Sequence, residues 1–180
     1  MVTARKKVQT FLNESGISNR NQPLLVNGYQ THGNLFDIEN HHIDYLEKTI
    51  RSEIDKYWKI HSSSEEGFIR GWPKGYDLYG WIVSMKSGGN LRPHIHSQGW
   101  LSGSIYIHVP RKKNDKSGNL VLSLGEDADA RLPRKNRSKI LDVVTGSMVL
   151  FPASLMHHTI PFESNEDRVV FAFDMKSPTF

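Results

Sequence analysis

Residues 80–110 read GWIVSMKSGGNLRPHIHSQGWLSGSIYIHVP, and the rest of the chain is interpreted outward from this stretch. It places His94 and His96 between two runs that are rich in β-branched and aromatic residues, the composition typical of strands. In an extended chain, residues i and i+2 point to the same side. The two imidazoles are therefore expected to share one face.

A third histidine, His157, lies in residues 151–162, FPASLMHHTIPF, which also resemble a strand. Three imidazoles that converge from two strands would form a metal site with open coordination positions, as catalytic metals have. His158 points to the opposite face and could replace His157 only if the strand register shifted by one. Because the chain has nine histidines, the His-x-His pair alone also fits two half-exposed strand residues.

From Phe68 onward the hydrophobic pattern is typical of strands. Short runs rich in Val, Ile and aromatic residues alternate with Gly, Pro, Asn and Ser, and their number favours a closed or double-sheet antiparallel barrel. The predicted strands are Tyr79–Lys86, Leu91–His96, Leu101–Val109, Asn119–Leu124, Ile140–Val144, Ser147–Phe151, Met156–Pro161 and Arg168–Met175.

The N-terminal part is predicted to be helical, with a short helix over 5–14 and a long one over 39–60. The longer segment repeats Ile43, Leu46, Ile50 and Ile54 at helical spacing, so its apolar stripe should pack on a sheet. At 180 residues the chain has the size of one domain. We expect a single domain over 1–180, with an arm and covering helix in 1–67 and the β core in 68–180.

Composition narrows the chemistry of any site. The chain has no cysteine, which excludes disulfides, thiolate ligands and cysteine nucleophiles, so a metal would need N or O ligands. Neither a signal-peptide h-region nor a long apolar run is present, so a soluble, cytoplasmic location is expected. Two basic runs, 111–116 and 131–139, raise the net charge to +4, and we interpret them as solvated loops, with a nucleic-acid partner still open.

Three strings in this order carry a resemblance to a known family: PHIHSQGWLSGSIYIHVP, GNLVLSLG and VTGSMVLFPASLMHHTIPFESNEDRVVFAFDM. Together they resemble the iron(II)- and 2-oxoglutarate-dependent oxygenases, in particular the prolyl-hydroxylase-like branch, over roughly residues 78–175. The resemblance implies a mainly β double-stranded β-helix, a jelly-roll with one or two N-terminal helices on its outer sheet. It also implies Fe(II), 2-oxoglutarate and dioxygen, and hydroxylation of a substrate with release of succinate and carbon dioxide.

Residue by residue, the resemblance makes His94 the first metal ligand and His157 the distal one. Arg168 matches the residue that binds the far carboxylate of 2-oxoglutarate, and Tyr106 matches a tyrosine that hydrogen-bonds this co-substrate. The sequence departs from the superfamily at His96, where an Asp or Glu is usual, so the resemblance implies a three-histidine site. The 2-oxoglutarate dianion would then supply all the negative charge at the metal.

Two geometrical expectations accompany this assignment. If 156–161 and 168–175 form a hairpin, Arg168 lies about 13 Å along the strand from His157, a gap that the diacid and an arginine side chain would span. Trp100, directly after the ligand pair, is the tryptophan expected near the substrate.

A cupin is the alternative, because Gly88, His94 and His96 fit the start of one cupin motif and Gly146, Pro152 and His157 fit the other. A cupin would need a glutamate three or four residues after His96, where Trp100 and Leu101 stand. A further alternative, a binding module without a metal, would use the basic loops. The primary substrate stays open, because fold and cofactor do not determine it.

Overall fold

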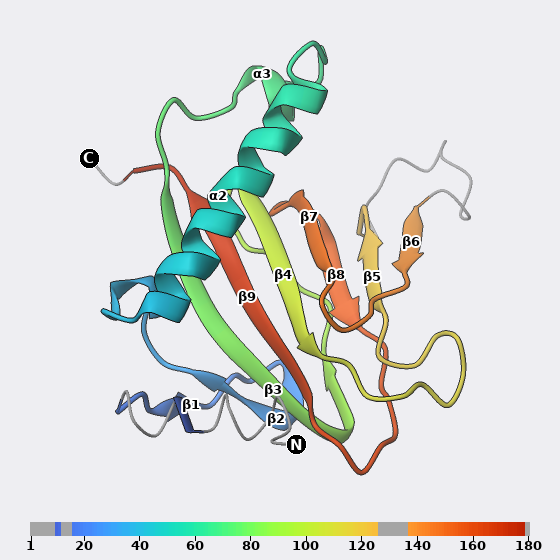
Figure 1. The fold of residues 1–180 in the computed structure, drawn as a ribbon. Coiled ribbons are helices and arrows are strands. Elements are labelled where there is room, and N and C mark those ends of the chain that lie inside the picture. Colours follow the sequence, from blue (N-terminus) through green and yellow to red (C-terminus); the bar gives the residue numbers. More distant parts are fainter. Residues whose placement is uncertain (1–9, 12–15, 126–136, 179–180) are drawn as a thin grey trace.

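The computed structural model describes residues 10–11, 16–125 and 137–178. Figure 1 shows a long helix lying across a large sheet, with a smaller sheet beside it. The elements, in chain order, are β1 (Asn19–Arg20), β2 (Leu25–Thr31), η1 (Leu35–Asp37), α2 (His41–His61), α3 (Gly67–Arg70), β3 (Asp77–Leu91), β4 (Leu101–His108), β5 (Leu120–Ser123), β6 (Ser138–Leu141), β7 (Met148–Pro152), β8 (Met156–Thr159) and β9 (Arg168–Lys176).

The strands form two sheets in which every pairing is antiparallel. The larger sheet has the order β1-β2-β3-β9-β4-β7 and the smaller one β6-β5-β8. Side chains of both sheets meet in one apolar cluster, where Leu120 of β5 packs with Tyr106 of β4 and Val170 of β9. The mainly β, double-stranded β-helix predicted from the sequence is confirmed.

One predicted strand and one predicted strand pairing are wrong. A separate strand over Leu91–His96 is absent, because β3 continues to Leu91 and the chain then leaves the sheet at Pro93, which has no N–H to donate. The predicted hairpin of the last two strands is also absent. β8 pairs with β5 in the smaller sheet, whereas Arg168 of β9 lies opposite Met85 of β3.

Helix α2 covers the outer face of the larger sheet, close to the predicted span of 39–60. Its first turn is capped by Asn40, whose side-chain oxygen accepts a 2.9 Å hydrogen bond from the backbone N–H of His42. Ile50 and Ile54 are buried against Phe173 and other sheet residues. No helix in the described ranges is long and apolar enough to cross a membrane. The helix predicted over 5–14 lies almost entirely outside the described residues.

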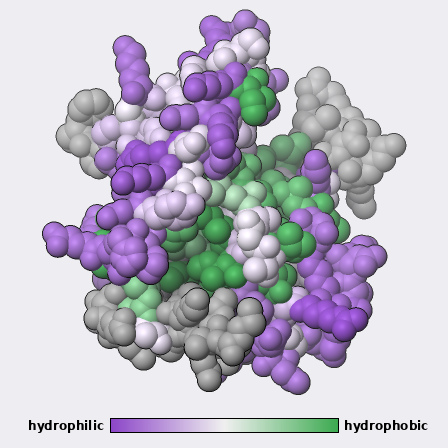
Figure 2. All heavy atoms as spheres, viewed as in Figure 1, coloured by the Kyte–Doolittle hydropathy of each residue, from purple (hydrophilic) through white to green (hydrophobic). Residues whose placement is uncertain are grey.

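The outer face of the sheet is covered only in part. Figure 2 shows hydrophobic atoms at the surface beside α2, over the region of β4 and β7. The partly buried apolar side chains of these strands include Ile105, Ile107, Met148 and Leu150. Helix and apolar surface both belong to the outer face, whereas the opposite face carries apolar side chains such as Val83 and Val170 together with buried polar ones such as Arg168 and Asp174.

Strand β9 lies between β3 and β4 and sends alternate side chains to the two faces of the sheet. Val169, Phe171, Phe173 and Met175 face the core beneath α2. The intervening residues line a cavity on the other side: Arg168, Val170, Ala172, Asp174 and Lys176. The same period of two therefore builds the hydrophobic core and supplies one wall of the candidate site.

Candidate active site

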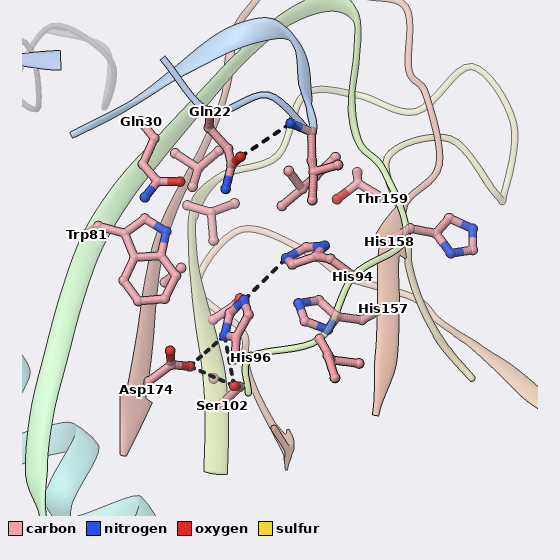
Figure 3. A pocket seen from close by; sticks show the side chains of 18 of the residues that line it. Gln22, Gln30, Trp81, His94, His96, Ser102, His157, His158, Thr159 and Asp174 are labelled. Carbon is pink, nitrogen blue, oxygen red and sulfur yellow. Dashed lines mark hydrogen bonds and ion pairs between the residues drawn. The ribbon is translucent and has the colours of Figure 1, made fainter. Parts of the chain in front are cut away.

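The structure brings His94, His96 and His157 together, with their candidate ligand nitrogens all within 4.8 Å of one another (Figure 3). The backbone explains how residues distant in sequence meet. His94 and His157 exchange two backbone hydrogen bonds, of 3.1 and 2.9 Å, and the His96 N–H donates to the carbonyl of Ala153 at 3.0 Å. The loop that follows β3 is thereby fixed along β8 and the turn before it.

The hydrogen-bond partners determine which ring nitrogen carries the hydrogen in two of these histidines. His94 Nδ1 lies 2.8 Å from the carbonyl oxygen of Arg92, and His157 Nδ1 lies 3.1 Å from that of Leu155. A carbonyl oxygen only accepts, so each Nδ1 must be the donor. The Nε2 atom of each ring is then unprotonated and free to coordinate a metal.

His96 is oriented by a side chain instead of a carbonyl group. Its Nδ1 lies 2.6 Å from Asp174 Oδ1, and the hydroxyl of Ser102 donates to the same oxygen at 2.7 Å. A carboxylate that accepts from both leaves the hydrogen of His96 on Nδ1 and the lone pair on Nε2. The expectation that only 2-oxoglutarate brings negative charge to this site is therefore wrong, because Asp174 lies directly behind His96.

The donor set fits a divalent transition metal. His94 Nε2 and His96 Nε2 are only 3.2 Å apart. Because each ring carries its hydrogen on its own Nδ1, neither Nε2 can donate a hydrogen bond to the other. A cation bound by the two lone pairs satisfies both atoms, and His157 presents a third imidazole to the same point. Imidazole ligands suit iron, nickel and zinc and do not suit magnesium or calcium.

Burial keeps the rings of His94 and His157 neutral. Burial, reinforced by the neighbouring His94, lowers the pKa of His157 to about 3. Burial also lowers the pKa of His94, although its hydrogen bond to Arg92 opposes this shift. Histidine coordinates a metal as the neutral ring, so near neutral pH no proton has to leave these two residues before a metal binds.

Arg168 is a buried cation without a carboxylate partner. Only 3% of its surface is exposed, its Nε has no hydrogen-bond partner, and no ion pair among the described residues includes it. Its guanidinium carbon lies 5.1 Å from the ring centre of Tyr106, which is itself buried. Burial lowers the pKa of Arg168, and Tyr106 opposes this, but arginine stays protonated in proteins.

One cavity of about 350 Å³ is lined by both Arg168 and the three histidines. Tyr106 is not among its lining residues and instead lies against the Arg168 guanidinium. Two aromatic residues line another part of the wall. The ring of Trp81 is 5.6 Å from that of His96, and the Tyr79 ring is 4.3 Å from the ammonium group of Lys176.

Trp100 does not lie where the sequence suggested. It stacks on Phe68 of α3 at 5.7 Å, within the core cluster beneath the helices, and does not line the cavity. Trp81 is the tryptophan at the site. The signal for it was its position two residues after Tyr79 on a strand, which places both rings on one face.

The rings of two further histidines, His158 and His108, and the first basic run lie away from the three candidate ligands. His158 points away from the other labelled side chains in Figure 3, as its position on the strand requires. His108 Nε2 lies 3.5 Å from Glu166. In the first basic run, Lys112 pairs with Asp142 and Lys113 with Glu163. Most of the second run lies outside the described residues.

Residues 79–174 match the protein family described as "Putative 2OG-Fe(II) oxygenase". This match covers just over half of the chain and includes all three histidines and Arg168. The chain belongs to this family. The 2OG-Fe(II) oxygenases are oxidoreductases that use Fe(II), 2-oxoglutarate and dioxygen, so the predicted enzyme class and cofactors are confirmed and the cupin alternative is set aside.

Solved structures show the same fold at low sequence identity. A prolyl hydroxylase from Trichoplax adhaerens, in complex with a hypoxia inducible factor peptide fragment, has a TM-score of 0.65 and 14% identity, over 97% of this chain and 76% of that one. A Pseudomonas putida prolyl-4-hydroxylase has a TM-score of 0.61 and 11% identity, over 97% and 84%. HygX from Streptomyces hygroscopicus, with nickel and 2-oxoglutarate bound, has a TM-score of 0.58 and 13% identity, over 99% and 81%. No curated protein matches the oxygenase in sequence.

Proposed function

We propose that this oxygenase hydroxylates a C–H bond of its substrate, with Fe(II) held by His94, His96 and His157 and 2-oxoglutarate held by Arg168. In the reaction, a substrate C–H bond, 2-oxoglutarate and dioxygen give the alcohol, succinate and carbon dioxide. The iron, when bound, supplies the activation of dioxygen that this oxidation needs. The protein contributes the ligands, their orientation and the cavity that would hold the co-substrate and the substrate.

The unpaired charge of Arg168 carries this proposal. A buried cation without a counter-ion costs several kcal/mol, and such a charge is normally paired or occupied by a ligand. The cavity beside it contains the three histidines, so an anion bound to Arg168 would extend toward the metal site. A diacid fits this arrangement, because one carboxylate can bind the guanidinium bidentately while the other end stays free for the metal. Since the predicted hairpin is absent, the diacid would bridge the two sheets instead of running along one hairpin.

The cavity wall with Trp81 and Tyr79 is the space that we assign to the primary substrate. Trp81 lies next to His96, so a substrate on this wall would be close to the metal. Lys176 and Arg20 line the same cavity, and both carry positive charge. These residues would orient the substrate, while the Nδ1 hydrogen bonds of the histidines keep the ligand nitrogens directed into the cavity.

The direct test is succinate release by protein loaded with Fe(II) under anaerobic conditions and then exposed to dioxygen. Release that requires both Fe(II) and 2-oxoglutarate is the expected result. A protein that binds metal but neither binds nor consumes 2-oxoglutarate would contradict the proposal.

Tyr106→Phe is expected to weaken 2-oxoglutarate binding by about 1–3 kcal/mol, the range for leaving one buried polar group unsatisfied, because the Arg168 guanidinium loses the hydroxyl that it contacts. The substitution keeps the ring against Arg168 and removes only the hydroxyl. Tyr106→Leu also removes the ring and should weaken binding further, because the guanidinium loses its support. The measurement is calorimetric titration of anaerobic, metal-loaded protein, with Tyr45→Phe, at an exposed tyrosine of α2 outside the cavity, as the matched control. Unchanged binding in Tyr106→Phe would show that the hydroxyl has no part in binding and would leave Tyr106 only the contact of its ring with Arg168.

A further inference from the structure

We propose that Asp174 is a positioning residue of the metal centre, a role that rests on the proposed function. It holds His96 in the form whose Nε2 faces the metal. It also places a negative charge behind His96. In the superfamily's usual His-x-Asp/Glu motif, by contrast, the carboxylate binds the metal itself. In this site the carboxylate would therefore contact a ligand of the metal, His96, and not the metal itself.

The hydrogen bonds around Asp174 are those of a carboxylate fixed in one orientation. Its Oδ1 accepts from His96 Nδ1 at 2.6 Å and from the Ser102 hydroxyl at 2.7 Å. Ser102 Oγ is also 3.1 Å from His96 Nδ1, so the three groups form a closed triangle. The hydroxyl holds the carboxylate from β4 while the carboxylate holds the ring. His94 and His157 have only backbone carbonyls in the corresponding place.

The charge of Asp174 is protected from water and directed at His96. Asp174 is 7% exposed and Ser102 is 1% exposed. The loop passes close over the carboxylate, because a Cβ placed on Gly99 would lie 2.9 Å from the Cβ of Ala153 and 3.4 Å from Asp174 Cγ. Among the described residues, the ion-pair partner of Asp174 is His96 alone. A charge in such surroundings is screened far less than one in water.

This arrangement should strengthen metal binding. A carboxylate that accepts the N–H of the ring nitrogen not bound to the metal fixes the tautomer of a ligating histidine and raises the basicity of its coordinating nitrogen. Three neutral ligands leave the full charge of a divalent cation uncompensated, and Asp174 offsets part of it across the ring. The position of Asp174 on β9, six residues after Arg168 and on the same face, places the two charged groups in one cavity.

The experiment compares Ni²⁺ affinity, by competition with a chromophoric chelator, in the parent, Asp174→Asn and Asp174→Ala. An asparagine can still accept from His96 Nδ1, so Asp174→Asn removes the charge and retains the orientation. We expect it to bind Ni²⁺ about 10- to 100-fold more weakly, the usual effect of losing an outer hydrogen-bond partner of a metal ligand. Asp174→Ala removes orientation as well and should bind more weakly still. Asp142→Asn, a carboxylate paired with Lys112 outside the cavity, is the matched control and should bind like the parent.

A second readout separates this role from a structural one. At saturating Ni²⁺, Asp174→Asn should bind 2-oxoglutarate at least as tightly as the parent, because a negative charge near the dianion has been removed. A variant whose packing is damaged would bind both metal and co-substrate more weakly. Weaker metal binding without weaker co-substrate binding is therefore the signature of a charge behind the ligand.

Three results would overturn the inference. Parent-like Ni²⁺ affinity in Asp174→Asn would show that the charge of Asp174 does not matter, and parent-like affinity in Asp174→Ala as well would show that the orientation does not matter either. A loss as complete as that of His157→Ala would make Asp174 a ligand itself, and weaker binding of both metal and 2-oxoglutarate would make its role structural. If the Asp174 variants do not fold, Ser102→Ala decides instead: it should bind Ni²⁺ about 2- to 10-fold more weakly, and parent-like affinity there would overturn the inference. A parent protein that binds no metal would contradict the proposed function and not this role alone.

Discussion

Arg168→Ala is expected to bind 2-oxoglutarate about 30- to several-thousand-fold more weakly than the parent, equivalent to about 2–5 kcal/mol. The physical reason is that the far carboxylate of the diacid would enter a buried site and find no cation there. Metal binding should be unchanged, because the three histidines are positioned by their own hydrogen bonds and not by Arg168. The measurement is calorimetric titration of 2-oxoglutarate into anaerobic, Ni²⁺-loaded protein.

The controls address packing and specificity. Arg168→Met fills most of the same volume without the charge, so it should lose 2-oxoglutarate while keeping its unfolding free energy within about 1 kcal/mol of the parent. Arg168→Lys should recover part of the affinity, because an ammonium group cannot reproduce the bidentate fork. Arg70→Met, at an exposed arginine of α3, should bind like the parent. Undiminished binding in Arg168→Ala and Arg168→Met would remove Arg168 from the co-substrate site.

The parts of the fold that could be predicted are those in which apolar residues recur at the regular spacing of a helix or a strand. Helix α2 was visible because Ile43, Ile50 and Ile54 recur at helical spacing and are buried as expected. The strands of the core were visible from their β-branched and aromatic residues. Their pairing was not, since the period of two shows which side chains share a face but not which strand lies alongside. This explains why Arg168 was assigned to a hairpin with β8 and lies instead opposite Met85.

In the candidate site, too, some features could be predicted from the sequence and others could not. His94, His96 and His157 could be singled out by residue type, and the structure brings them together. The shared face predicted for His94 and His96 is confirmed by the 3.2 Å between their Nε2 atoms, although the two residues lie in a loop fixed by hydrogen bonds to residues 153–157 and not on a regular strand. The residue types alone do not mark Asp174 as part of the site, although an acidic residue inside the apolar run RVVFAFDM is itself a signal. A charge in an apolar strand needs a partner, and the sequence alone does not say that the partner is His96.

His157→Ala is expected to weaken Ni²⁺ or Fe(II) binding on the order of 1,000-fold or more. It removes a ligand outright, and so exceeds the 10- to 100-fold loss typical of an outer partner. His157 is the residue to change first, because it is 6% exposed and its low pKa keeps it neutral. The adjacent His158→Ala is the matched control, since the His158 ring points away from His94, His96 and His157 (Figure 3). Affinity is measured by competition with a chelator, on variants whose thermal unfolding shows one cooperative transition.

His96→Ala then separates a three-histidine centre from a two-histidine one. If His96 is a ligand, His96→Ala should lose affinity comparably to His157→Ala, and the carboxylate of Asp174 would be left buried without the ring hydrogen that it accepts. If His96 only lines the cavity, metal affinity should stay near that of the parent, and His94 and His157 would hold the ion with other donors. A loss of binding in His158→Ala with none in His157→Ala would show that β8 has shifted by one residue, and the histidine assignment would fail at the strand that provides it.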